Sequence, residues 1–163
     1  MVVKPAQSPL APKTTPTLPR VAGVKLGAAR SGVRYKDRDD IMLAVVPAGA
    51  TIAGVLTRSK TSSAPVDWCR KNPARGKVRA IVVNAGNANA FTGKAGDKAV
   101  EESTRAIAQA LGCPRNEVFM ASTGVIGQPL DWEKIAATGR VAGPYSTMMN
   151  AWSATSRPSE TTT

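Results

Sequence analysis

The sequence contains no histidine, and this absence excludes several kinds of active site. Ser-His-Asp and Cys-His nucleophile pairs need an imidazole as the base, so neither can form on this chain. The commonest zinc ligand is missing for the same reason. Cysteine is scarce, since Cys69 and Cys113 are the only two and neither belongs to a CxxC pair. We therefore expect free thiols in a cytosolic protein, because reducing compartments keep isolated cysteines unpaired.

Aromatic residues are also few, at 4% of the 163 residues, although 42% of the residues are hydrophobic. A core of Ala, Val, Ile and Leu with much Gly suits the close-packed layers of an α/β fold. No apolar run approaches the roughly 20 residues that a membrane helix needs. Residues 1–20 hold five prolines and no apolar stretch, so we expect an extended N-terminal arm there and no secretory signal.

Acidic residues are half as numerous as basic ones, 11 against 22, which leaves a formal net charge of +11. Such a charge attracts nucleic acid or acidic small molecules. The basic residues are scattered along the chain, which favours a solvated basic surface over a nucleic-acid or membrane site. A non-enzymatic basic module that binds nucleic acid or acidic metabolites stays open as an alternative. It predicts an affinity that falls steeply with salt.

The pattern of apolar residues predicts one layered α/β domain at residues 21–138. Two β-branched runs, 41–46 and 51–57, are separated by a short Pro-Ala-Gly-Ala loop and are interpreted as a hairpin. Residues 139–163 lack periodicity and form an irregular tail rich in Gly, Pro, Ser and Thr. The expected strands are 21–29, 41–46, 51–57, 78–84 and 118–122, and the expected helices are 66–70, 94–111 and 132–137.

The clearest element is the helix at 94–111, where small and apolar side chains recur at three- and four-residue spacing. Gly112 and Pro114 follow it as stop signals. An apolar strand is expected on each side of this helix, and strand, helix and strand together form a βαβ-like crossover. Parallel strands end at the same edge of a sheet, so we expect the two segments after them to meet there. The face expected to be buried consists of Ala99, Ser103, Ala106, Ile107, Ala110 and Leu111.

Those two segments are the most informative part of the chain. Residues 82–93 read VVNAGNANAFTG, and residues 120–127 read MASTGVIG. Each begins as an apolar run and breaks into small residues with amide or hydroxyl groups. The Thr123 hydroxyl and the Gly124 amide could act as the two donors of an oxyanion hole. In the alternative interpretation Thr123 only satisfies local backbone groups, and the asparagines only stabilise a tight turn.

A nucleophile is harder to find on this chain. Ser122 and Thr123 have no histidine to activate them, and no lysine lies at a recognisable spacing. The remaining route is an N-terminal threonine whose own α-amine acts as the base. Such a residue must be freed by cleavage, and the sequence shows no cleavage site.

At these segments the chain resembles the ornithine acetyltransferases, which are bifunctional glutamate N-acetyltransferase/amino-acid acetyltransferases of arginine biosynthesis. The resemblance covers about residues 8–138, and its last two motifs are highly specific in combination. The matching stretches are SPLAPK at 8–13, AGVKL at 22–26, GVLTRSK at 54–60 with its surroundings, 84–93 and 121–129.

The resemblance implies a precursor that cuts itself before a threonine, giving an α and a β chain that assemble as α2β2. It implies an enzyme without metal or organic cofactor, in which that threonine takes the acetyl group from N-acetylornithine and passes it to glutamate. Whether acetyl-CoA is a further donor stays open. Thr123 and Gly124 match the family's oxyanion-hole pair, contributed by the α chain. The chain is thus expected to be the α-chain-like part and to be inactive alone.

The expected departure from the family is the tail at 139–163, which shows neither a substrate-binding strand nor a cleavage motif. A frameshift, a truncation or a divergent terminus would each produce it. A second enzyme class is also open, because N-terminal-nucleophile chemistry can hydrolyse as well as transfer. On that interpretation the chain is a fragment of an aminopeptidase or amidase.

Overall fold

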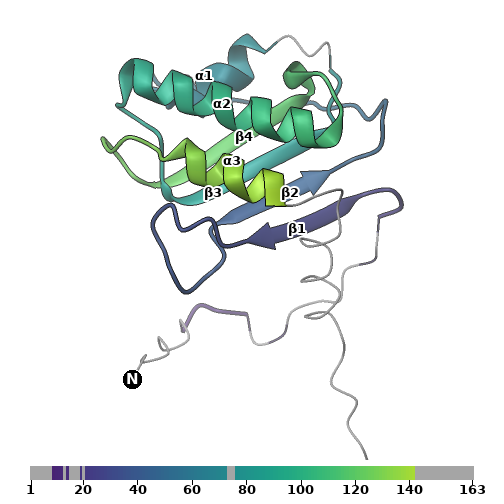
Figure 1. Ribbon diagram of the computed structural model, residues 1–163, viewed down its shortest axis with the longest axis horizontal. Helices are drawn as coiled ribbons and strands as arrows, with labels where there is room; N and C mark the ends of the chain where they lie inside the picture. The colour runs from purple at the N-terminus through teal and green to yellow at the C-terminus, as the bar shows by residue number, and fades with distance from the viewer. Residues whose placement is uncertain (1–8, 13, 15–18, 20, 73–75, 142–163) are drawn as a thin grey trace, which may run out of the picture.

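The computed structural model describes residues 9–12, 14, 19, 21–72 and 76–141, with side chains up to residue 138. Its four strands form one mixed sheet in the order β1-β2-β3-β4, with helices packed against it (Figure 1). The elements in chain order are β1 (Lys25–Ala29), β2 (Ile41–Val45), α1 (Ala64–Lys71), β3 (Ala80–Asn87), α2 (Gly93–Leu111), the 3-10 turn η1 (Arg115–Glu117), β4 (Val118–Val125) and α3 (Trp132–Val141).

The predicted crossover is confirmed. β3 and β4 are parallel neighbours joined through α2, and β3 lies in the interior of the sheet between β2 and β4. Their register pairs Ala80 with Val118 at one end and Gly86 with Gly124 at the other. β1, β2 and β3 are antiparallel to one another in turn. The two glycine-bearing segments therefore leave the sheet at the same edge, as expected from parallel strands.

The predicted hairpin of 41–46 with 51–57 is wrong. β2 pairs with β1 on one side and β3 on the other, so both of its edges are occupied. Residues 52–57 contain no strand, and only Thr51 forms an isolated bridge, with Lys77. A β-branched composition favours an extended backbone, but it does not specify which strand lies alongside it.

Two strands also continue further than the sequence pattern predicts. β3 runs to Asn87 instead of ending at Asn84, and β4 runs to Val125 instead of Ser122. Thr123 and Gly124 consequently lie within β4, not in a turn after it. Their small and polar side chains suggested a turn, but pairing with β3 keeps this backbone extended.

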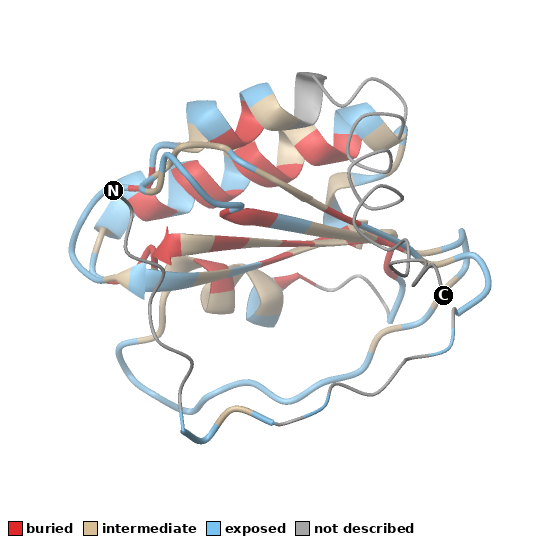
Figure 2. Ribbon diagram, turned by 90° about the horizontal axis from the view of Figure 1, so that it is seen from below, coloured by how far each residue is buried: buried red, intermediate tan, exposed pale blue. Residues whose placement is uncertain are grey.

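The core lies between the sheet and the helices α2 and α3, which run side by side over one face (Figures 1 and 2). We call this the covered face. Ala99, Ser103 and Ile107 of α2 are buried there as predicted. Ala106 and Ala110 are not buried, and Val100, Thr104 and Ala108 take their places. α2 ends at Gly112, whose φ of 60° gives the left-handed cap that the glycine predicted.

α1 closes the outer edge of the sheet. Trp68 Nε1 donates to the Val118 carbonyl at 3.0 Å, and Cys69 Sγ donates to the Met120 carbonyl at 3.4 Å. Asn72 Nδ2 donates to the Asn116 carbonyl at 2.7 Å, just before β4. Outward-facing carbonyls of an edge strand are thereby paired with side chains of a helix, which protects that edge.

The other face of the sheet, here called the open face, is apolar but poorly covered. Side chains alternate between the two faces along each strand, and the register aligns them across the sheet. Leu26 and Met42 on this face are 42% and 40% exposed. The open face consists of Leu26, Ala28, Met42, Ala44, Ile81, Val83, Ala85, Phe119, Ala121 and Thr123. Within the described residues, no helix combines the length and the apolar character needed to cross a bilayer.

Candidate functional site

Thr123 and Gly124 lie near the carboxyl end of β4, and both are exposed to solvent. Their register partners on β3 are Ala85 and Gly86. The structure thus brings the two sequence motifs together at one edge, as predicted from the crossover. Main-chain bonds tie the motifs further, because Ala88 N donates to the Val125 carbonyl and Gly127 N donates to the Ala90 carbonyl, each at 2.9 Å.

Gly124 occupies a position that only glycine fits. Its φ is +134°, which L side chains rarely adopt, and an added Cβ would lie 2.5 Å from the Asn87 nitrogen. Gly86 has a φ of +103°, and an added Cβ there would lie 2.8 Å from the Cβ of Arg34. A register shift follows directly at Asn87. The two glycines let β3, β4 and the 34–35 loop approach one another closely.

The buried asparagines of the first motif stabilise the loop itself. Asn84 Nδ2 donates to the Asn87 carbonyl at 2.8 Å, and Asn87 Oδ1 accepts from the Asn89 amide at 2.7 Å. Asn89 Nδ2 donates to the Gly96 carbonyl at 3.0 Å. All three side chains are buried and have both amide atoms paired within this chain. These bonds support the structural interpretation, because the side-chain nitrogen and oxygen of each asparagine have a hydrogen-bond partner within this chain.

Adjacent hydroxyls on β4 have different surroundings. Ser122 faces the helices, and its Oγ donates to Asn84 Oδ1 at 2.5 Å. Thr123 faces the open side, and its hydroxyl has no hydrogen-bond partner among the described residues. Ser122 is thus fixed by the core, whereas the Thr123 hydroxyl is available to a ligand. This difference follows from the alternation of side chains along a strand.

A loop that the sequence pattern did not predict covers Gly86. Arg34 and Tyr35 pack over that glycine, and Arg34 Nη1 donates to Gln128 Oε1 at 3.3 Å. The loop is held by buried Asp40, whose carboxylate accepts from the amides of Ser31 and Val33 at 2.6 and 3.1 Å. The dense charge of this stretch gave no signal of a packed loop. The glycine at 86 is the one signal that could have indicated the close approach of another segment.

Neither cysteine has the character of an activated nucleophile. Burial raises the pKa of the Cys69 thiol, and the hydrogen bond to the Met120 carbonyl only partly opposes that shift. Burial likewise raises the pKa of Cys113, against the favourable charge of Arg79. Both cysteines are free and remain thiols at neutral pH. The described residues contain no group of three or more acidic or cysteine side chains placed to hold a metal ion.

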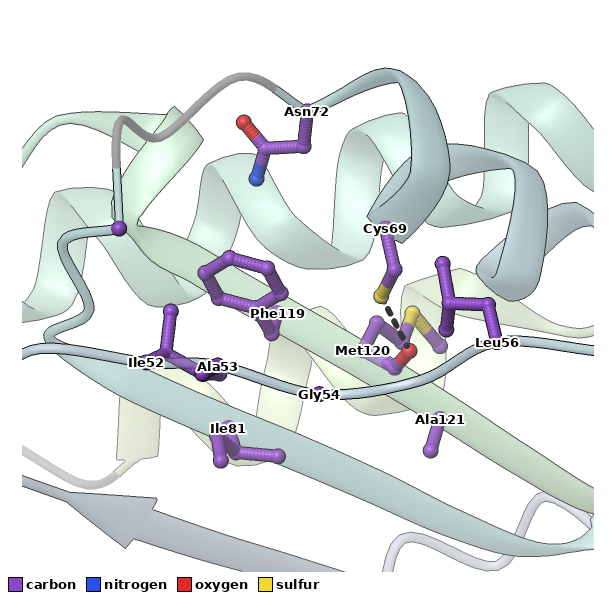
Figure 3. A pocket seen from close by; sticks show the side chains of 11 residues that line it. Ile52, Ala53, Gly54, Leu56, Cys69, Asn72, Ile81, Phe119, Met120 and Ala121 are labelled. Carbon is purple, nitrogen blue, oxygen red and sulfur yellow. Dashed lines mark hydrogen bonds between the residues drawn. The ribbon is translucent and has the colours of Figure 1, made fainter.

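A cavity of about 540 Å³ lies beside this site, between residues 52–56, α1 and the open face (Figure 3). Its walls are mainly apolar, with Ile81, Phe119 and Ala121 from the sheet. Thr123 is not part of its lining, although Ala121 stands two residues earlier on the same side of β4. The cavity therefore adjoins the Thr123 position without including it.

Comparisons with known proteins agree with this arrangement. The model of the ArgJ family matches residues 25–157. The arginine biosynthesis bifunctional protein ArgJ of Bradyrhizobium diazoefficiens is 54% identical over 136 residues, which are 83% of this chain and 33% of that protein. The protein of the same name from Agrobacterium fabrum is 53% identical over 131 residues, 80% of this chain and 32% of the relative. The chain thus spans about a third of the length of these curated relatives.

Two solved structures resemble the fold. ArgJ of Bacillus halodurans gives a TM-score of 0.68 at 33% identity, over 73% of this chain and 62% of that chain. The ornithine acetyltransferase of Mycobacterium tuberculosis, solved in complex with ornithine, gives a TM-score of 0.69 at 32% identity, over 72% of this chain and 64% of that chain. The α/β fold expected from the sequence is therefore confirmed. The family match runs past residue 138, while the division into arm, domain and tail stays a prediction, with much of the arm and tail outside the described residues.

Proposed function

The chain belongs to the ArgJ family of arginine biosynthesis, and from this membership we propose that it is the α-chain-like part of an ornithine acetyltransferase. In this proposal the assembled enzyme moves an acetyl group from N-acetylornithine to glutamate. The chain contributes the oxyanion hole, and the nucleophilic threonine stands on a partner chain. Alone, the chain is expected to have no acetyl-transfer activity.

The observation that carries the proposal is the position of Thr123 beside Gly124. The Thr123 hydroxyl has no partner among the described residues, and Gly124 belongs to a tight junction with β3 that holds the backbone in place. A hydroxyl donor next to a fixed main-chain amide suits an oxyanion, because preorganised donors need not reorient during the reaction. The exposure of both residues in this chain is consistent with a site that a second polypeptide completes.

The chemistry proceeds in two transfers. The threonine hydroxyl of the partner gives its proton to the α-amine of the same residue, and its oxygen attacks the acetyl carbonyl carbon of N-acetylornithine, so that the carbonyl electrons move onto oxygen. Thr123 and Gly124 donate hydrogen bonds to that oxyanion. When it collapses, the C–N bond breaks, and ornithine leaves after its nitrogen takes a proton. The glutamate amine then attacks the acetyl ester through the same kind of oxyanion, which releases the threonine and N-acetylglutamate.

The proposed partner is a β chain freed by self-cleavage of a longer precursor, in an α2β2 assembly. Lengths support it. The matched region makes up 62% of the solved Bacillus halodurans chain but only 33% of the Bradyrhizobium protein, so the solved chain is about half as long as the curated relative. The apolar open face also supports a partner, because contiguous exposed apolar surface marks interaction sites.

The proposed enzyme works without a cofactor and in the cytosol. The proposed chemistry needs no metal or organic cofactor, since hydrogen-bond donors and a threonine are sufficient for acyl transfer. We infer a cytosolic location from the two free cysteines, which are typical of reducing compartments. Acetyl-CoA as a second acetyl donor is a separate question that product analysis answers.

The test combines this chain with the polypeptide that follows the matched region in the Bradyrhizobium diazoefficiens relative. Acetyl exchange between N-acetylornithine and glutamate should appear only in the mixture. Thr123→Ala should then lower kcat by about 10²–10³, as loss of one oxyanion donor does elsewhere. Thr123→Ser keeps a hydroxyl and should retain most of the rate. Turnover by this chain alone, or a full rate in Thr123→Ala, would contradict the proposal.

A further inference from the structure

A strand-like segment without a strand partner crosses the open side of the sheet. We call residues 52–57 the strap. Its ends are fixed, because Ile52 N donates to the Gly76 carbonyl at 2.7 Å and Arg70 Nη2 donates to the Thr57 carbonyl at 2.8 Å. Between these anchors, the main chain of residues 53–56 makes no hydrogen bond to any described residue. The strap is therefore held at both ends and unpaired in its middle.

The side chains of the strap are apolar and exposed. Val55 is 97% exposed and Leu56 is 46% exposed, although both belong to residue types that are usually buried. The composition of this segment favours a strand. An extended backbone with free amide and carbonyl groups and exposed apolar side chains is a template for pairing with another strand. The segment has the properties of an edge strand that lacks a neighbour among the described residues.

The space beneath the strap is hollow and apolar. Figure 3 shows the strap passing over β3 and β4, with Ile81 of β3 on one side of it and with Phe119 of β4 and Cys69 of α1 on the other. The cavity between them measures about 540 Å³. Close packing is the rule in protein interiors, so a hollow of this size with apolar walls suits the side chains of an incoming chain.

We propose that the strap is a docking strand for the partner polypeptide. An extended strand from the remaining part of an ArgJ-type protein pairs with the backbone of residues 53–56 and inserts an apolar side chain into the cavity beneath them. This inference rests on the proposed function, which identifies the partner. The length of the relatives supports that occupant, because this chain spans only 33% of the Bradyrhizobium protein.

A second copy of this chain is a less suitable occupant. Each copy carries a net charge of +11, and the strap is followed directly by Arg58 and Lys60, both exposed. Two such surfaces repel each other, whereas a partner of lower positive charge does not face that repulsion. The strap is therefore assigned to the partner polypeptide, and self-association becomes an outcome that the experiment can detect.

The experiment measures amide hydrogen exchange in the strap and the affinity for the partner. This chain is titrated with the Bradyrhizobium polypeptide that follows the matched region. We expect the amides of residues 53–56 to exchange quickly in the free chain and to become protected in the complex. Val55→Pro removes one donor and should weaken binding at least about 10-fold, which corresponds to about 1.4 kcal/mol. Val55→Thr keeps the amide and the β-branched shape and should bind nearly as well as the parent chain.

The outcomes separate this proposal from the proposed function. A complex that transfers acetyl groups while residues 53–56 stay unprotected overturns the docking strand and leaves the function in place. A complex that protects the strap without acetyl transfer supports the docking strand and contradicts the function. Protection that rises with the concentration of this chain alone, or failure of the two polypeptides to associate, overturns the docking strand. If Val55→Pro unfolds the chain, amide exchange of residues 53–56 in the unaltered chain still tests the docking strand.

Discussion

The two faces of the sheet share the same strands but differ in what lies on them. On the covered face, Val82 and Met120 are buried beneath α2 and α3. On the open face, Leu26 and Met42 remain substantially exposed, and the strap spans a hollow (Figure 3). Both faces are apolar, so composition does not explain the difference. What differs is that α2 and α3 pack over one face, whereas the described residues cover the other face only in part.

The same contrast separates neighbouring residues on β4. Ser122 points to the covered face and completes a hydrogen bond to a buried asparagine. Thr123 points to the open face with its hydroxyl unpartnered among the described residues. One residue along a strand therefore separates a structural hydroxyl from one that can serve a ligand. The proposed chemistry takes place on the side of the sheet that the described residues leave largely uncovered.

The largest loss of stability is expected at Gly124, where β4 contacts the backbone of β3. Gly124→Ala places a methyl group against the β3 backbone at a φ of +134°. We expect a loss of about 3 kcal/mol in unfolding free energy, from backbone strain and steric overlap together. Gly127→Ala is the matched control, because φ is +77° but no atom lies within 4 Å of the added Cβ. It should cost about 1 kcal/mol. If urea denaturation gave equal losses of unfolding free energy for the two variants, the junction between β3 and β4 would have space for a side chain, which would contradict this prediction.

A smaller effect compares the faces directly on one strand. Val82 is fully buried on the covered face, whereas Val83 is partly exposed on the open face. Val82→Ala should lower the unfolding free energy by about 2 kcal/mol, because two buried methyl groups are lost. Val83→Ala should cost less than about 1 kcal/mol in the isolated chain. Adding the partner polypeptide should enlarge the effect of Val83→Ala only. A larger loss for Val83→Ala in the isolated chain would contradict the contrast between the faces.

The smallest expected effect is a change of folding stability with pH. Burial raises the pKa of Cys69 and of Cys113 in the folded chain. As pH rises through the ordinary thiol range, the unfolded chain loses these protons first, so it binds fewer protons than the folded chain and stability falls. Denaturation curves between about pH 8 and pH 10 should show this decline. The double variant Cys69→Ala/Cys113→Ala should show less of it. An identical decline in the double variant would assign it to other groups.

Local patterns were sufficient to predict the β3–α2–β4 crossover. The spacing in α2 and the stop signal at Gly112 concern neighbouring residues, and helix formation depends mainly on such contacts. The crossover then brought both motifs to one edge by topology alone. The prediction of which face of α2 is buried was less accurate, because Ala106 and Ala110 are as apolar as several residues that are buried. Only the position of α3 and the sheet selects among them.

Pairing between distant segments could not be predicted in the same way. Residues 51–57 have the composition of a strand, but no strand in the described part of the chain pairs with residues 52–57. The packing of Arg34 and Tyr35 over Gly86 joins segments about fifty residues apart and leaves no periodic signal. Thr123 and Gly124 were identified through family resemblance, because a hydroxyl beside a glycine is common in proteins.

The hydrogen bonds from Trp68 and Cys69 to the β4 carbonyls also limit how such sheets can join. An open-ended fibre of edge-to-edge sheets needs two available edges on every molecule, one to accept a neighbour and one to offer to the next. With the β4 edge occupied by a helix, joining through β1 can link at most two molecules before growth stops. The open face can thus stay exposed, as the proposed docking requires, without the chain propagating into a filament along its sheet edges.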